Sequence, residues 1–84
     1  MQNNTVVISL AGRDKNCRFV VLGNEGDCLI LADGRMRPLE RPKKKNRRHV
    51  AQTNLMIPPE RVTTNKALRL SLAETYAMIG KGGL

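Results

Sequence analysis

Short apolar runs alternate with clusters of turn-forming residues over the first part of the chain. The β-branched run Thr5–Ala11 predicts a strand, and Cys17–Leu22 and Cys28–Ala32 have a similar strand-forming composition. Gly12–Asn16 separates the first two runs and Gly23–Asp27 the next two, and both clusters contain residues that tolerate the positive φ angles of tight turns. We therefore predict three short strands joined by two turns.

Two further strands are expected before residue 58. Asp33 and Gly34 form a strong signal for a two-residue hairpin, so we expect Arg35–Arg37 to return as a fourth, antiparallel strand. Pro38 cannot donate a ladder hydrogen bond, which predicts that this strand is short or lies at an edge. His49–Ile57 predicts a fifth strand, with one face formed by Ala51, Thr53, Leu55 and Ile57.

The last part of the chain has the pattern of a helix. Pro58 and Pro59 end the strand, and Thr63–Asn65 offers capping side chains ahead of a helix over Lys66–Ile79. We expect a C-terminal cap at Gly80 and a frayed tail over residues 81–84. The apolar face could dock a partner, but packing against the strands is the more common use, and this face comprises Leu68, Leu72, Tyr76 and Ile79.

These elements together predict the fold class. A chain of 84 residues is expected to build one compact core. Short strands with Gly-rich turns and one late helix favour a mainly β protein, a small five-stranded SH3-like barrel with one C-terminal α-helix, over a sandwich or a βαβ unit. We expect the barrel to cover residues 1–57, including a basic loop at 41–48, and a linker and packed helix to cover residues 58–84.

Charge changes the picture more than any other property of the composition. Fifteen Lys and Arg against seven Asp and Glu give a formal net charge of +8, which favours a polyanionic partner over a merely solvated surface. Eight of the fifteen cations lie between Arg35 and Arg48, where Glu40 is the single acid. Arg41–Arg48 would repel itself as an isolated peptide, so we expect it to fold around an anion or to stay mobile until it meets one.

Two basic clusters, distant in sequence, flank the ends of predicted strands. Loops at such ends of a small barrel project together, so we predict one positive rim that neutralises several phosphates. Binding of this kind depends strongly on salt and only weakly on sequence. The candidate RNA-binding residues are Arg13, Lys15, Arg18, Arg35, Arg37, Arg41, Lys43, Lys44, Lys45, Arg47, Arg48 and His49.

The sequence offers little for catalysis or metal binding. Cys17 and Cys28 lack metal-ligand spacing, and His49 is the only histidine, so we expect no metal, no cofactor and no small-molecule substrate. The sequence contains no recognisable combination of a nucleophile, a base and a metal site, and we predict that the chain is not an enzyme. The acids of the turns and linkers show no pairing that suggests general acid and base roles; they are Glu25, Asp27, Asp33 and Glu40.

We predict that both thiols are free. A hairpin that turns about Glu25 and Gly26 would place Cys28 opposite Gly23, leaving Cys17 roughly 16 Å away along the neighbouring strand at ~3.3 Å per residue. A disulfide requires Cα atoms within about 7 Å of each other. No apolar run is long enough to span a bilayer and the first residues lack a signal-peptide pattern, so we expect a cytoplasmic protein without membrane contact.

A family resemblance adds to this interpretation. Residues 7–21, VISLAGRDKNCRFVV, resemble a KOW motif, in which a strand leads through a basic turn into a second strand. Residues 30–45, ILADGRMRPLERPKKK, are similar to short bacterial KOW-domain RNA-binding proteins akin to large-subunit ribosomal proteins. The resemblance covers about residues 5–55 and implies an SH3-like barrel whose turn contacts RNA. Asn16 stands where the motif usually has glycine, and we expect the turn to survive because Asn tolerates positive φ.

Three binding hypotheses follow. The first is RNA binding, to structured ribosomal RNA or a ribosome-linked transcript in translation, by backbone contacts that read shape more than sequence. The second is a protein-interaction adaptor that docks on ribosomal proteins or RNA polymerase through the C-terminal helix. The third is DNA binding, since phosphates of the two nucleic acids look alike to lysine.

Overall fold

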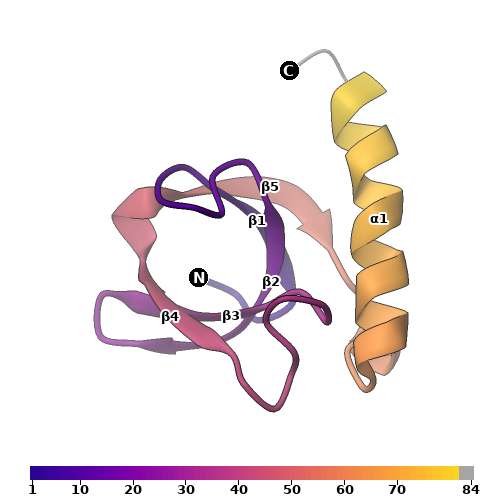
Figure 1. The fold of residues 1–84 in the computed structure, drawn as a ribbon, viewed down its shortest axis with the longest axis horizontal. Coiled ribbons are helices and arrows are strands. Elements are labelled where there is room, and N and C mark those ends of the chain that lie inside the picture. The colour runs from indigo at the N-terminus through magenta and orange to yellow at the C-terminus, as the bar shows by residue number, and fades with distance from the viewer. Residues whose placement is uncertain (82–84) are drawn as a thin grey trace.

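The computed structural model describes the backbone of residues 1–81 and the side chains of residues 1–76. Five antiparallel strands form one sheet in the order β4-β3-β2-β1-β5, and Figure 1 shows this sheet curled into a ring with α1 against its outside. This confirms the predicted mainly β class, five strands and a single C-terminal helix. The strands are β1 (Thr5–Ser9), β2 (Arg18–Glu25), β3 (Cys28–Ala32), β4 (Lys43–Asn46) and β5 (Val50–Met56).

The first two turns follow the predicted positions, with one shift of register. Asn16 has φ 74°, so the residue that replaces glycine in the basic turn adopts the positive φ expected of it. In the next hairpin Cys28 pairs with Glu25, not with Gly23 as predicted. The turn is therefore the two residues Gly26 and Asp27, and only Gly26 needs a positive φ, of 60°. Both cysteines are free thiols.

The predicted fourth strand at Arg35–Arg37 is wrong. The Asp33 carboxylate accepts hydrogen bonds from the backbone N–H groups of Arg35 and Arg37, both at 2.8 Å, and closes a compact loop instead of a hairpin. Gly34 has φ 77°, and a Cβ there would overlap the Asn65 carbonyl oxygen and lie 3.1 Å from the Arg69 backbone nitrogen. This loop packs against the start of α1, and the edge of β3 where a returning strand would pair is occupied by β4.

The strand that pairs with β3 is instead drawn from the basic segment. Leu29 and Leu31 pair with Lys45 and Lys43 of β4, and a 3₁₀ turn, η1 (Arg47–His49), links β4 to β5. The prediction of a basic loop over residues 41–48 is corrected accordingly. The physical reason is that alternate lysines of β4 point toward a carboxylate of another loop, so the self-repulsion of the segment is partly neutralised.

Two apolar clusters lie on opposite faces of the sheet. Val7, Phe19, Val21, Leu29, Leu31 and Val50 fill the inside of the ring. Val6, Val20, Ala32 and Ile57 face outward and are covered by the helix, which contributes Leu68 and Leu72. Consecutive residues of β1 and β2 are apolar because both faces of these strands are buried.

The helix α1 (Asn65–Lys81) begins as predicted, since the Thr64 hydroxyl accepts a hydrogen bond from the Ala67 N–H at 3.1 Å. Packing of its apolar face on the barrel is confirmed for Leu68 and Leu72, whereas Tyr76 is 46% exposed. The expected cap at Gly80 is wrong because the helix continues to Lys81. The side chain of Ile79 and the tail over residues 82–84 lie outside the described residues.

Candidate nucleic-acid interface

The loop between β1 and β2 meets the loop between β3 and β4 at one end of the barrel. Arg13 of the first loop and Arg37 of the second line the same pocket, of about 450 Å³. Lys43 and Lys45 of β4 line it as well, with Phe19 and Met36. Two basic clusters that are distant in sequence therefore share one cavity.

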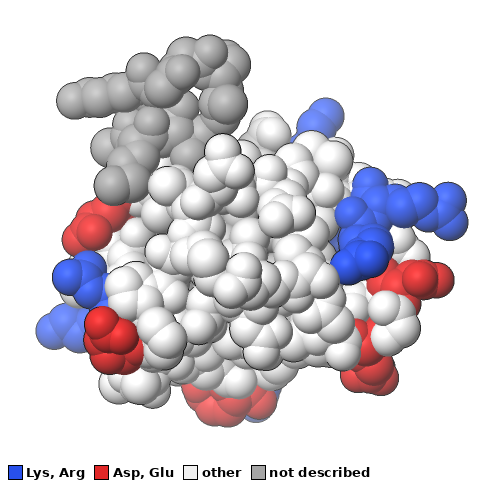
Figure 2. Space-filling model, turned by 180° about the vertical axis from the view of Figure 1, so that it is seen from behind, with Lys and Arg blue, Asp and Glu red and all other residues white. Residues whose placement is uncertain are grey.

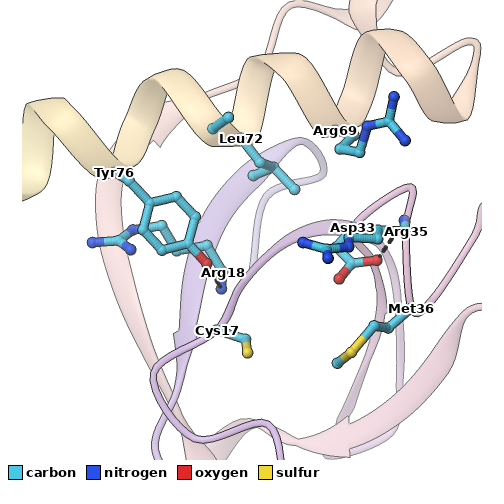
Figure 3. Close-up of a pocket in the computed structure, with 9 residues that line it drawn as sticks. Cys17, Arg18, Asp33, Arg35, Met36, Arg69, Leu72 and Tyr76 are labelled. Atoms are coloured by element: carbon cyan, nitrogen blue, oxygen red, sulfur yellow. Dashed lines mark hydrogen bonds between the residues drawn. The ribbon is translucent and has the colours of Figure 1, made fainter.

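A second pocket, of about 400 Å³, adjoins the first and lies between the barrel and α1. Arg18, Arg35 and Arg69 line it, and its wall is otherwise largely apolar (Figure 3). Met36 borders both pockets, and its side chain is 61% exposed. We call the cations of the two pockets the basic rim; they are Arg13, Arg18, Arg35, Arg37, Lys43, Lys45 and Arg69. Only two carboxylates line the same pockets, Asp14 and Asp33.

Arg18 is held by an aromatic ring. Its guanidinium carbon lies 3.8 Å from the centroid of the Tyr76 ring, and the Tyr76 hydroxyl accepts a hydrogen bond from the Arg18 backbone N–H at 3.3 Å. The Nε of Arg18 is buried without a hydrogen-bond partner among the residues that the structure describes. The ring face, rather than an acceptor, therefore fixes this guanidinium.

Asp14 ties β4 to the loop between β1 and β2. Its carboxylate pairs with Lys43 and, at 2.9 Å, with Lys45, and accepts a hydrogen bond from the Ser9 hydroxyl at 2.7 Å. Burial, followed by repulsion from Lys45, lowers the pKa of Lys43, and the carboxylate between the two ammonium groups opposes that repulsion. The two lysines are thus first a structural clamp, and only their residual charge is available to a ligand.

Lys44 does not belong to the rim. It alternates with its neighbours along β4 and pairs with Glu25 of β2 at 2.6 Å in an exposed position. The hydrogen bond that Lys44 donates to the Glu25 carboxylate, and the negative charge of that carboxylate, raise the pKa of Lys44. The charge of Lys44 is therefore already balanced by Glu25. Lys44 also lines neither of the two pockets.

The remaining predicted residues lie outside the two pockets. Lys15 is exposed in the same loop as Arg13, and Arg41 is exposed after Pro38, whose carbonyl accepts its backbone N–H. η1 lies beside the first loop, because the His49 carbonyl accepts a hydrogen bond from the Leu10 N–H at 2.8 Å. Its side chains are exposed, and none of them lines either pocket; they are Arg47, Arg48 and His49.

Four residues of this region were not among the predicted site residues; they are Asp14, Met36, Arg69 and Tyr76. Asp14 is the lone acid of a basic turn, and its position among cations was the available signal. Arg69 and Tyr76 lie seven residues apart in the helix, so helical periodicity places them on one side, next to the buried stripe. Met36 carries no recognisable signal, because it was assigned to a strand that does not form.

The face seen from behind the view of Figure 1 has a different character. Figure 2 shows that its centre is uncharged and that basic side chains at its margins lie near acidic ones. In residues 1–81 no group of three or more His, Cys, Asp or Glu side chains is arranged to hold a metal ion. None of the helices in the described part of the chain has the length and apolar character needed to cross a bilayer.

Neither a known protein-family model nor a curated protein matches the sequence.

Proposed function

We propose that the chain is an RNA-binding module of the KOW type on an SH3-like barrel, and that it binds ribosomal or ribosome-linked RNA through the basic rim. One observation carries the proposal: two loops separated by about twenty residues, together with β2, β4 and α1, bring seven cations and two carboxylates to two adjoining pockets. The excess of five positive charges in so small an area is suited to a sugar-phosphate chain.

The composition of the rim favours contacts to phosphate. Arginine contributes five of its seven cations, and guanidinium groups hold phosphate oxygens in a bidentate geometry. Specificity in such a module comes from the shape of the RNA and its 2′-hydroxyls more than from base edges. The proposed activity is binding alone, without a chemical step.

Salt dependence of binding tests the proposal. If the rim engages about five phosphates, log affinity plotted against log salt should fall with a slope between about −3.5 and −4.5. Fluorescence polarisation of a labelled RNA hairpin measures this slope, and competition with a DNA duplex of the same sequence separates RNA from DNA binding. A slope near zero would exclude the rim as the binding surface.

A pair of matched arginine variants locates the interface. Arg37→Ala should weaken binding and reduce the magnitude of the slope by about 0.7–0.9, the loss of one phosphate contact. Arg61→Ala makes the same charge change on the other flank of α1, where Arg61 pairs with Glu74 at 3.6 Å, and should leave the slope unchanged. Equal losses in the two variants would mean that net charge alone, and not the rim, attracts the RNA.

A further inference from the structure

The pocket between α1 and the barrel has a form that phosphate binding alone does not require. Its wall is mostly apolar and includes the Tyr76 ring and the Leu72 and Met36 side chains, while three arginines stand at its border. A cavity of about 400 Å³ is within the range of roughly 300–1,000 Å³ typical of sites for small organic groups. A phosphate chain lying across the surface would leave this apolar wall uncovered.

The pocket is held open by contacts that do not depend on a ligand. Asp33 closes the loop that carries Met36, and Gly34 rests against the first turn of α1. Asn65 fastens the same loop a second time, since its Oδ1 accepts the Leu39 N–H at 2.8 Å. Asp33 thus fixes the shape of the loop, the distance between the loop and the helix is fixed at two points, and the cavity between them is preformed.

The aromatic wall is arranged for stacking. The Arg18 side chain passes behind the Tyr76 ring and covers one of its faces, and no residue drawn in Figure 3 covers the other face. The Arg35 side chain lies beside Asp33, across the pocket from the edge of the ring (Figure 3). A flat π system stacked on the uncovered face of Tyr76 would have the Arg18 cation behind the ring and the Arg35 cation across the pocket, an arrangement that suits an electron-rich base attached to an anionic backbone.

We propose that this pocket holds a single unpaired nucleotide of the bound RNA, with its base on Tyr76 and Met36 and its flanking phosphates toward Arg35 and the adjoining pocket. The inference rests on the proposed RNA binding and names the RNA feature that the module selects: a bulge or an unpaired end beside a duplex. Met36 lies between the two pockets and borders both. In this proposal the RNA backbone passes from one pocket to the other at Met36, and the unpaired nucleotide turns out of the backbone at that point.

The test compares two hairpin RNAs that differ by one bulged nucleotide, with 2-aminopurine as the bulged base. The full chain should bind the bulged hairpin about tenfold more tightly than the paired one, the effect of one base–aromatic stack. The 2-aminopurine fluorescence should be quenched on binding. Equal affinity for the two hairpins, with the salt dependence intact, would overturn the inference and leave the proposed function standing. Loss of salt-dependent binding to both would overturn the proposed function as well.

Variants of the chain's single tyrosine separate stacking from folding. Tyr76→Phe keeps the ring and should retain the preference for the bulge and the quenching. Tyr76→Leu should lose both, and Leu70→Ala, at an exposed position of the same helix, is the matched control that should keep both. Retention of the preference in Tyr76→Leu would place the base elsewhere and refute the proposal.

A free nucleotide has the same chemistry as the bulged one, so its binding is measured separately. Adenosine monophosphate should displace the bulged RNA only weakly, because it lacks the contacts of the neighbouring phosphates. Binding of the free nucleotide as tight as that of the bulged RNA would identify the pocket as a site for a small molecule and overturn the assignment to RNA.

Discussion

Replacement of Asp14 by asparagine should lower stability and raise the affinity for RNA at the same time. The carboxylate is the shared counterion of Lys43 and Lys45, whose side chains are 15% and 13% exposed. Asparagine keeps the shape of Asp14 and a hydrogen-bond acceptor for the Ser9 hydroxyl, but leaves two largely buried ammonium groups facing each other.

The size of the effect follows from burial. Removing one partner of a buried ion pair lowers the free energy of unfolding by about 3–5 kcal/mol. We take the lower figure because the three side chains are partly exposed. A loss of about 3 kcal/mol in a domain of this size lowers Tm by about 12–24 °C. Thermal unfolding followed by circular dichroism measures the change.

The same substitution adds one positive charge to the rim. Under the proposed function, the slope of log affinity against log salt should steepen by up to about 0.7–0.9, since two lysines no longer share a carboxylate. Asp27→Asn makes the same charge change in the exposed turn between β2 and β3, and should alter neither Tm nor the slope. An Asp14→Asn protein with the Tm of the wild type would refute the clamp, and an unchanged slope would show that the two lysines do not face the RNA.

Three further predictions concern the loops that shape the site. Gly34→Ala should cost about 2–5 kcal/mol, from the positive φ and the overlap with Asn65, and an unchanged midpoint of urea unfolding would contradict this close approach. Asn16→Val should be less stable than Asn16→Gly by about 1–2 kcal/mol, because a β-branched residue resists φ 74°; equal melting temperatures would count against it. The pKa of Glu40 should lie below the ordinary value for glutamate, chiefly because the Asn65 amide donates to its carboxylate at 2.6 Å. A depressed folded-state pKa stabilises the fold above the ordinary pKa of glutamate, and that contribution is lost as the pH falls through the depressed value. An NMR titration should show the Glu40 pKa rising in Asn65→Ala, and an unchanged value would remove the amide as its cause.

The sequence predicted the structure correctly where the conformation depends on contacts between residues close in sequence. The bounds of the strand over residues 28–32 were predicted without error, and Asn16 adopts the positive φ inferred from its tolerance of that conformation. Thr63–Asn65 was predicted to cap the helix, and Thr64 does so. In each case the deciding interaction lies within a few residues of the signal.

Two failures, the predicted strand over residues 35–37 and the predicted loop over residues 41–48, share a physical cause, which is contact between residues distant in sequence. Asp33 and Gly34 have the composition of a tight hairpin, yet the conformation of their loop is decided by Asn65, about thirty residues later. β4 consists of three lysines and an asparagine, and no alternation of apolar residues marks it as a strand. It forms because β3 offers a ladder and Asp14 supplies the counter-charge, neither of which is visible in the segment itself.

The position of α1 limits what the helix can do for function. Leu68 and Leu72 complete the apolar cluster over Val6 and Val20, so these leucines are not available to dock a protein partner as the adaptor hypothesis required. Removing residues 60–84 would expose the outer face of β1 and β2, and would therefore report on folding before it reported on any partner. The helix flank that carries Tyr76 faces the basic rim, which makes α1 a wall of the proposed RNA site. An adaptor role is left with the outward side of the helix, where Leu70 is 53% exposed and forms no part of the core.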